Sequence, residues 1–137
     1  MALANPYQQY RQQQVNTAPP DKLLLLLYDA AIRFCNQAKA AMENNKTQEA
    51  HDAILKAERI IEEFTMTLNM DYEISKSLGA LYEYLNRRLF EANVQKNTEA
   101  VDEVLGFLIE LRETWVQAAV IARTGKVDMT GGGGFEG

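Results

Sequence analysis

The chain is poor in the residues that build catalytic and metal sites. Its 137 residues include one cysteine, Cys35, and one histidine, His51. Zinc sites and di-iron helical bundles need several Cys or His ligands, and no Ser-His-Asp or Cys-His pattern surrounds His51. A lone cysteine on an apolar helical face is typical of a reduced, buried and inert thiol. The sequence therefore predicts no metal, no cofactor and no enzymatic activity.

The chain also lacks the features of membrane and nucleic-acid proteins. No apolar run approaches the ~18 residues that a membrane span requires. The first residues lack a basic region followed by an apolar one, so we expect no secretory signal. The net charge of −5 makes a polyanionic partner such as nucleic acid unfavourable. These absences predict a cytoplasmic protein that neither enters a membrane nor binds nucleic acid.

Four long stretches instead carry apolar residues at helical spacing. We expect helices at about 20–43, 47–68, 74–92 and 98–125, with Thr47 and Asn97 as N-caps of the second and fourth. Long helices with short connections predict an all-α, antiparallel up-and-down four-helix bundle at 19–124. Residues 1–18 are rich in Gln and Asn and predict a mobile N-terminal arm. The Gly-rich residues 125–137 predict a disordered C-terminal tail.

The first predicted helix has more apolar residues than one buried stripe can hold. Leu23 to Leu27 and Tyr28 are six consecutive apolar residues, which at about 100° per residue surround the whole helix. A helix on one side of a bundle buries only one face, and each leucine left in water forgoes roughly 1.5–3 kcal/mol. The excess apolar surface predicts a binding protein whose partner covers it.

The aromatic residues fall into two groups. Phe64 and Trp115 lie on apolar stripes and are predicted core residues. Four tyrosines fit the border of a peptide groove and the edge of a bundle equally well; they are Tyr28, Tyr72, Tyr82 and Tyr84.

The N-terminal arm carries Tyr7 and Tyr10, which are three residues apart. One helical turn would place both rings on the same side, where they could cover exposed leucines as a lid. An untethered tail explains the same pattern equally well.

Two polar features have competing interpretations. His51 could mark a histidine phosphotransfer bundle, but Asp52 would repel a phosphoryl group and His51 lies in the first turn of its helix. A solvated surface histidine is the favoured interpretation. Arg87 and Arg88 point in different directions on a helix, so we expect pairs with nearby acids, such as Arg87 with Glu83. A homo-oligomerising structural bundle is the remaining alternative function.

Several segments of the chain, in order, closely resemble the flagellin-specific export chaperones of the FliS family. The resemblance spans residues 5–124. It is carried by Asn5-Pro6-Tyr7-x-x-Tyr10, Val15-Asn16-Thr17, Leu26-Leu27-Tyr28-Asp29, Leu68-Asn69-Met70-Asp71-Tyr72-Glu73-Ile74-Ser75, Tyr84-Leu85-Asn86-Arg87-Arg88-Leu89 and Arg112-x-x-Trp115. One departure is Pro19-Pro20-Asp21-Lys22, where the family often has Ser-Pro-Glu-Glu, so the N-cap hydroxyl is missing.

The resemblance implies a cytosolic chaperone with a helical bundle fold. Such a protein binds the disordered C-terminal segment of flagellin, prevents premature polymerisation and assists type III export, which also implies contacts with components of the flagellar export apparatus. It further implies that the arm residues Tyr7 and Tyr10 occupy part of the client surface when the client is absent. Together with the apolar excess, it suggests six partner-binding residues: Leu24, Leu27, Tyr28, Ile74, Leu78 and Tyr82.

Overall fold

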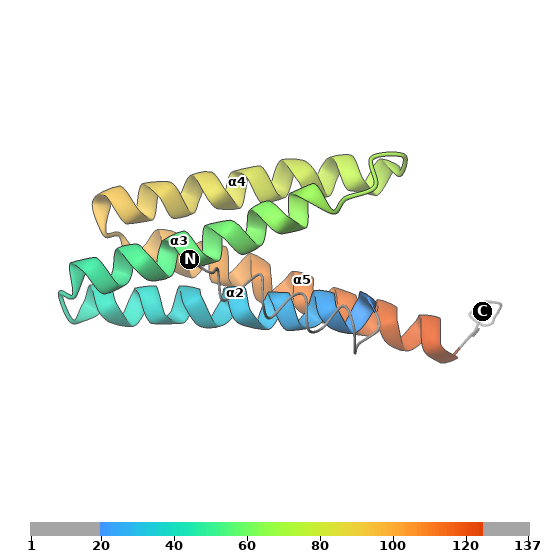
Figure 1. Ribbon diagram of the computed structural model, residues 1–137, viewed down its shortest axis with the longest axis horizontal. Helices are drawn as coiled ribbons and strands as arrows, with labels where there is room; N and C mark the ends of the chain where they lie inside the picture. Colours follow the sequence, from blue (N-terminus) through green and yellow to red (C-terminus); the bar gives the residue numbers. More distant parts are fainter. Residues whose placement is uncertain (1–19, 125–137) are drawn as a thin grey trace, which may run out of the picture. The chain divides into compact units, whose positions relative to one another are not determined.

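The computed structural model describes residues 20–124, with only the backbone given for 20, 21 and 122–124. The described residues form four α-helices and no strand (Figure 1). These are α2 (Pro20–Glu43), α3 (Thr47–Met66), α4 (Glu73–Gln95) and α5 (Thr98–Thr124). The all-α prediction is confirmed. The predicted arm at 1–18 and tail at 125–137 lie outside the described residues. None of the described helices is long and apolar enough to cross a membrane.

The helix boundaries follow from local hydrogen bonds. Asn97 caps α5 as predicted, because its Oδ1 accepts the backbone N–H of Glu99 at 2.9 Å. The predicted cap at Thr47 is wrong by one residue, since Thr47 is already helical and Lys46 occupies the N-cap position without a side-chain bond. The second helix ends at Met66 rather than near residue 68. There, the Thr67 hydroxyl donates to the Phe64 carbonyl and the chain turns.

The described chain divides into two compact units. The larger comprises residues 27–109, and the smaller contains the remaining ends of α2 and α5, at 20–26 and 110–124. In the smaller unit Leu23 to Leu26 are half-buried, while Ile121 is exposed. Trp115 is half-buried too, so the sequence placed it too deeply in the core.

The core of the larger unit is built around three aromatic rings from three helices. Tyr28 of α2 stacks on Phe64 of α3 with ring centroids 4.3 Å apart, and Phe64 lies 5.4 Å from the ring of Tyr82 on α4. The hydroxyls of Tyr28 and Tyr82 are 2.7 Å apart and hydrogen-bonded. Pairing satisfies hydroxyl groups whose burial would otherwise cost free energy. This solution lets two tyrosines occupy the core, where the sequence left their position open.

The α5 part of the larger unit is joined to the other helices by charged and aromatic contacts. Lys39 of α2 pairs with Asp102 at 2.9 Å. Glu103 accepts bonds from the Tyr84 hydroxyl and, at 2.7 Å, from Arg88 Nε. These bonds hold the pKa of Glu103 below its ordinary value, with the Tyr84 bond as the largest cause.

Arg88, rather than Arg87, is the arginine that pairs with acids. Besides its bond to Glu103, it lies 2.6 Å from Glu91. The guanidinium of Arg87 instead lies 5.9 Å from the centroid of the Tyr84 ring. The expected Arg87–Glu83 pair is not among the ion pairs of the described residues.

Candidate functional site

The two residues that could carry chemistry, Cys35 and His51, are held within the fold by burial or by a hydrogen bond. Cys35 is fully buried, and burial raises the pKa of its thiol to about 12. The thiol is therefore protonated at neutral pH and inert, as the sequence predicted. The half-buried His51 bonds through Nδ1 to the side-chain amide of Asn93, 2.9 Å away. Among residues 20–124, no group of three or more His, Cys, Asp or Glu side chains could hold a metal ion.

The six suggested partner-binding residues lie at very different depths. Leu27, Tyr28 and Tyr82 are buried in the chain's own interior, whereas Leu24 and Leu78 are half-buried. Ile74 is the only one that is largely exposed, at 64%. The structure joins Tyr28 to Tyr82 through their hydroxyl bond, and helix geometry puts Ile74 and Leu78 on one face of α4. Tyr7 and Tyr10 lie outside the described residues.

The leucines of α4 are buried in its C-terminal half, and apolar side chains become exposed towards its N-terminus. In its C-terminal half Leu85, Leu89 and Ala92 are fully buried. Towards the N-terminus Leu78 is half-buried and Ile74 is exposed, while its neighbour Ser75 takes the buried position. The first turn of α4 is therefore covered at Ser75 but leaves the apolar side chain of Ile74 in water.

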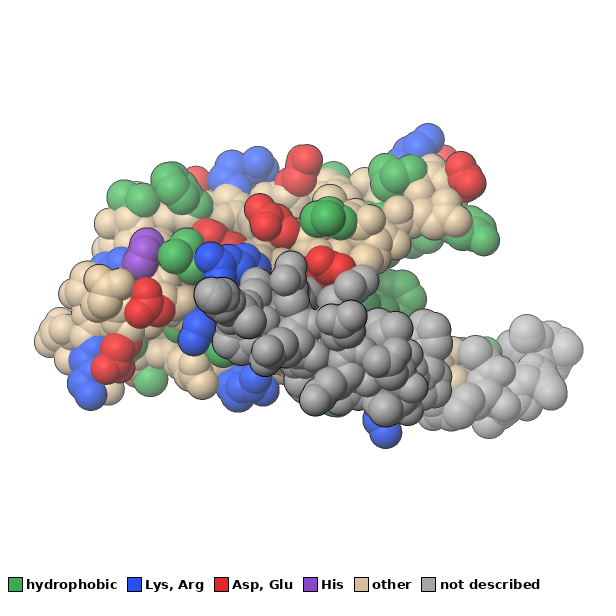
Figure 2. All heavy atoms as spheres, in the orientation of Figure 1, with side chains coloured by type: hydrophobic (Ala, Val, Ile, Leu, Met, Phe, Trp, Pro, Cys, Tyr) green, Lys and Arg blue, Asp and Glu red, His purple; other side chains and the backbone are tan. Residues whose placement is uncertain are grey.

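The connection between α3 and α4 extends this exposed end. Four large apolar side chains within nine consecutive positions are more than half exposed, and we call them the open-end surface: Met66 at 78%, Met70 at 54%, Tyr72 at 62% and Ile74 at 64%. Apolar side chains are visible at this connection in the space-filling view (Figure 2). Contiguous exposed apolar patches on a folded domain typically mark interaction sites.

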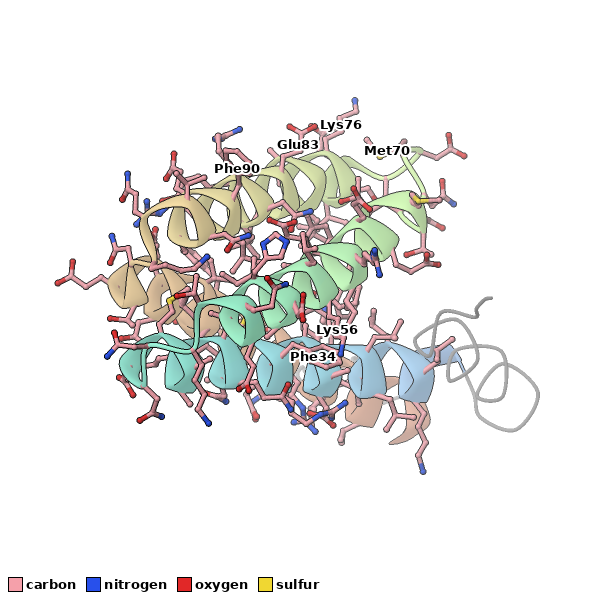
Figure 3. All side chains as sticks on the ribbon, turned by 60° about the vertical axis from the view of Figure 1, so that its left-hand side comes forward. Phe34, Lys56, Met70, Lys76, Glu83 and Phe90 are labelled. Carbon is pink, nitrogen blue, oxygen red and sulfur yellow. The ribbon has the colours of Figure 1, made fainter. Side chains whose placement is uncertain are left out.

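Hydrogen bonds give the connection a defined conformation. The Asn69 side chain accepts the backbone N–H of Asp71 at 3.0 Å, and its carbonyl accepts that of Tyr72 at 3.2 Å. This closed turn has Met70 and Asp71 at its tip, and Figure 3 shows Met70 at the end of the α3–α4 pair. Leu68 packs back toward α4, with Cδ1 3.5 Å from where a Cβ on Gly79 would lie. The open-end surface is thus carried on a hydrogen-bonded turn.

Sequence reasoning did not select Met66 or Met70, and it left Tyr72 undecided between two positions. All three lie at or beyond the end of a periodic segment, where helical spacing gives no information. A usable signal was present, because large apolar residues are unusual in a short interhelical connection.

The fold and the surface together define a class of protein: a helical binding protein whose exposed features are apolar rather than catalytic. A family model described as "Flagellar protein FliS" matches residues 3–122. The chain therefore belongs to the FliS family of flagellar secretion chaperones, which are not enzymes. A chaperone of this family has a flagellar substrate as its partner.

Curated relatives support the same assignment. The flagellar secretion chaperone FliS of Bacillus subtilis is 40% identical, over 98% of this chain and 99% of the relative. FliSB of Pseudomonas aeruginosa is 35% identical over 84% of this chain and 94% of the relative. The match therefore runs along nearly the whole sequence.

One solved structure shows that the fold is shared. Its title is "Crystal structure of flagellar chaperone from bacteria", and it superposes with a TM-score of 0.69. The match covers 82% of this chain and 94% of that chain at 24% sequence identity. At that identity the likeness supports the helical fold and nothing finer.

Proposed function

We propose that this chaperone acts in the cytoplasm on flagellin. It binds the disordered C-terminal segment of flagellin, keeps it from polymerising prematurely and assists its type III export. The observation that carries the proposal is the open-end surface, where four large apolar side chains stay in water at and beside the α3–α4 connection.

The energetics of a disordered client require such a surface. A segment that folds on binding loses conformational entropy, a cost of roughly 2–5 kcal/mol. Fully covering one large apolar side chain contributes roughly 1.5–3 kcal/mol. Four half-exposed side chains on a hydrogen-bonded turn can therefore offset the ordering cost. Methionine also adapts its shape to a partner, which suits a client that is not rigid.

Exposure suggests different roles for the candidate residues. Ile74 contacts the client directly, and Leu78 does so where it emerges from the core. The buried residues Leu27 and Tyr28 of α2 and Tyr82 of α4 act indirectly, by holding α4 in position. Leu24 remains a separate candidate in the smaller unit.

The test is calorimetry of the full chain against a synthetic peptide with the C-terminal sequence of flagellin. We expect a 1:1 complex with a strongly negative heat-capacity change. Ile74→Asp should weaken the affinity at least about tenfold, because it places a charge in the open-end surface. An acid in the first turn of α4 is favourable for the helix, so the variant should fold normally.

Ile109→Asp is the matched control. Ile109 is 53% exposed but lies on α5, away from the open-end surface in sequence. This control should bind the peptide like the parent chain. Absence of binding by the parent would contradict the proposed client, and equal loss in both variants would contradict the proposed surface.

The arm has its own test. We propose that Tyr7 and Tyr10 cover apolar surface until the client displaces them. Deleting residues 1–12 should then increase the fluorescence of a dye that binds apolar surface in the free chain. Unchanged fluorescence would count against the lid.

A further inference from the structure

The open-end surface contains both of the largely exposed methionines among the described residues. Met66 is 78% exposed and Met70 is 54% exposed. The sequence has five methionines; Met42 is half-buried, while Met1 and Met129 lie outside the described residues. In the described chain, the accessible thioether groups therefore lie at one place, where Figure 3 shows Met70 at the end of the α3–α4 pair.

Backbone geometry keeps both side chains in water. Met66 follows the buried Phe64 by two positions, and two residues at about 100° each place it on the opposite side of α3. Met70 lies at the centre of the turn that Asn69 closes, where the Asn69 carbonyl accepts the Tyr72 N–H at 3.2 Å. The two exposures are thus consequences of the fold.

The cysteine of the chain does not compete for an oxidant. Cys35 is fully buried, and burial raises the pKa of its thiol to about 12. A peroxide reacts with an accessible thiolate, and Cys35 is neither accessible nor ionised at neutral pH. A methionine thioether has no proton to lose, so its reaction requires access alone. Among the sulfur atoms of the described chain, oxidation is therefore directed to Met66 and Met70.

We propose that Met66 and Met70 form an oxidation site whose modification prevents client binding, an inference that rests on the proposed function of the open-end surface. The thioether sulfur attacks hydrogen peroxide, so that an S–O bond forms and the peroxide O–O bond breaks. The second oxygen leaves as water with both hydrogens. Sulfur loses two electrons and the peroxide gains them, and the product is methionine sulfoxide.

The sulfoxide changes the surface and leaves the fold intact. Both methionine side chains are already largely in water, so their oxidation removes no core contact. An apolar client would have to displace water from two polar sulfoxides, which is unfavourable. The client therefore loses affinity while the chaperone stays folded. Sulfoxide reductases return the thioether, so the modification is reversible.

Peptide mapping of the full chain locates the site without any client. The chain is treated with hydrogen peroxide, the peroxide is removed, and sulfoxides are assigned by mass spectrometry. Met66 and Met70 should be oxidised before Met42, because their side chains are more accessible. Circular dichroism should show the same helix content before and after treatment. Equal oxidation of Met42, or a loss of helix, would overturn the proposal.

Calorimetry against the C-terminal flagellin peptide measures the effect on binding. The oxidised chain should bind at least about tenfold more weakly than the untreated chain. Methionine sulfoxide reductases of both stereospecificities should restore the affinity. An unchanged affinity of the oxidised chain would overturn the effect on binding while leaving the proposed client in place. Absence of binding by the untreated chain would instead contradict both.

Leucine variants separate these two methionines from every other oxidisable group. The double variant with Met66→Leu and Met70→Leu keeps two apolar side chains of similar volume, so it should bind like the untreated parent. Peroxide should leave its affinity unchanged. Met42→Leu is the matched control and should lose affinity after peroxide treatment as the parent does. A double variant that still loses affinity would show that the sensitive group lies elsewhere, and would overturn the proposal.

Discussion

The two halves of α4 contain similar side chains in different surroundings. At the C-terminal end Leu85 and Leu89 are fully buried, whereas at the N-terminal end Ile74 is 64% exposed. The difference lies in the first turn of α4, where Ser75 takes the buried position at 4% exposure and Ile74, one residue away, stays in water.

The largest expected effect comes from truncating apolar side chains at the two ends of α4. Leu89→Ala should lower the free energy of unfolding by about 2–5 kcal/mol, because it leaves a cavity in a closed core. Ile74→Ala should change it by no more than about 0.5 kcal/mol, since the side chain is already largely in water. Denaturant unfolding of both variants measures the contrast. Similar losses in the two would show that the N-terminal half is covered.

Tyr82 is the first large side chain along α4 to be buried. Tyr82→Phe should cost about 1 kcal/mol by removing the buried bond to the Tyr28 hydroxyl while keeping the ring. The double variant with Tyr28→Phe should cost less than the sum of the single changes, because both remove the same bond. Strict additivity in a double-mutant cycle would argue against coupling between the two hydroxyls.

Gly79 lies in the N-terminal half of α4. A Cβ there would meet Leu68 Cδ1 at 3.5 Å, an ordinary van der Waals distance. Gly79→Ala should therefore stabilise the protein by about 0.5–1 kcal/mol through helix propensity, seen as a higher denaturation midpoint. A destabilised variant would instead show that the α3–α4 turn is packed too tightly to accept a methyl group.

The smallest expected effect concerns Glu103 of α5, which bonds to Tyr84 and Arg88 in the C-terminal half of α4. The pKa of Glu103 is lower in the folded chain than its ordinary carboxyl value of 4.5. Its contribution to the free energy of unfolding is therefore fully present above pH 4.5 and is lost as the pH falls through the folded pKa. The loss should be small, since the group is near the surface. Glu103→Gln should reduce the acid sensitivity of the unfolding midpoint below about pH 4.5. An identical pH profile would exclude this role.

Local patterns predicted the helices well. The buried face of α3 contains the residues that its spacing indicates, ending at Phe64, and α2 begins at Pro20 as its fixed φ favours. Errors occurred where local and tertiary effects compete. Helical spacing continued the second helix to residue 68, but the hydrogen-bonded turn at Asn69 ends it earlier.

The candidate site was harder to predict than the fold. Sequence reasoning selected Tyr28 and Tyr82 for a groove because a tyrosine hydroxyl normally needs water. In the structure the two hydroxyls are hydrogen-bonded to each other, which no sequence pattern indicates because the residues are 54 positions apart. Ile74 was also selected, and its binding role stays a prediction; it is exposed because its neighbour Ser75 takes the buried position in the first turn of α4.

The sequence by itself determined four helices and membership of the chaperone family, because helical periodicity and local motifs are properties of the chain alone. Only the tertiary structure decided which apolar side chains became core and which remained as surface. Burial is a property of pairs of elements: the same leucine or isoleucine stabilises the fold where another helix covers it and stays in water where none does.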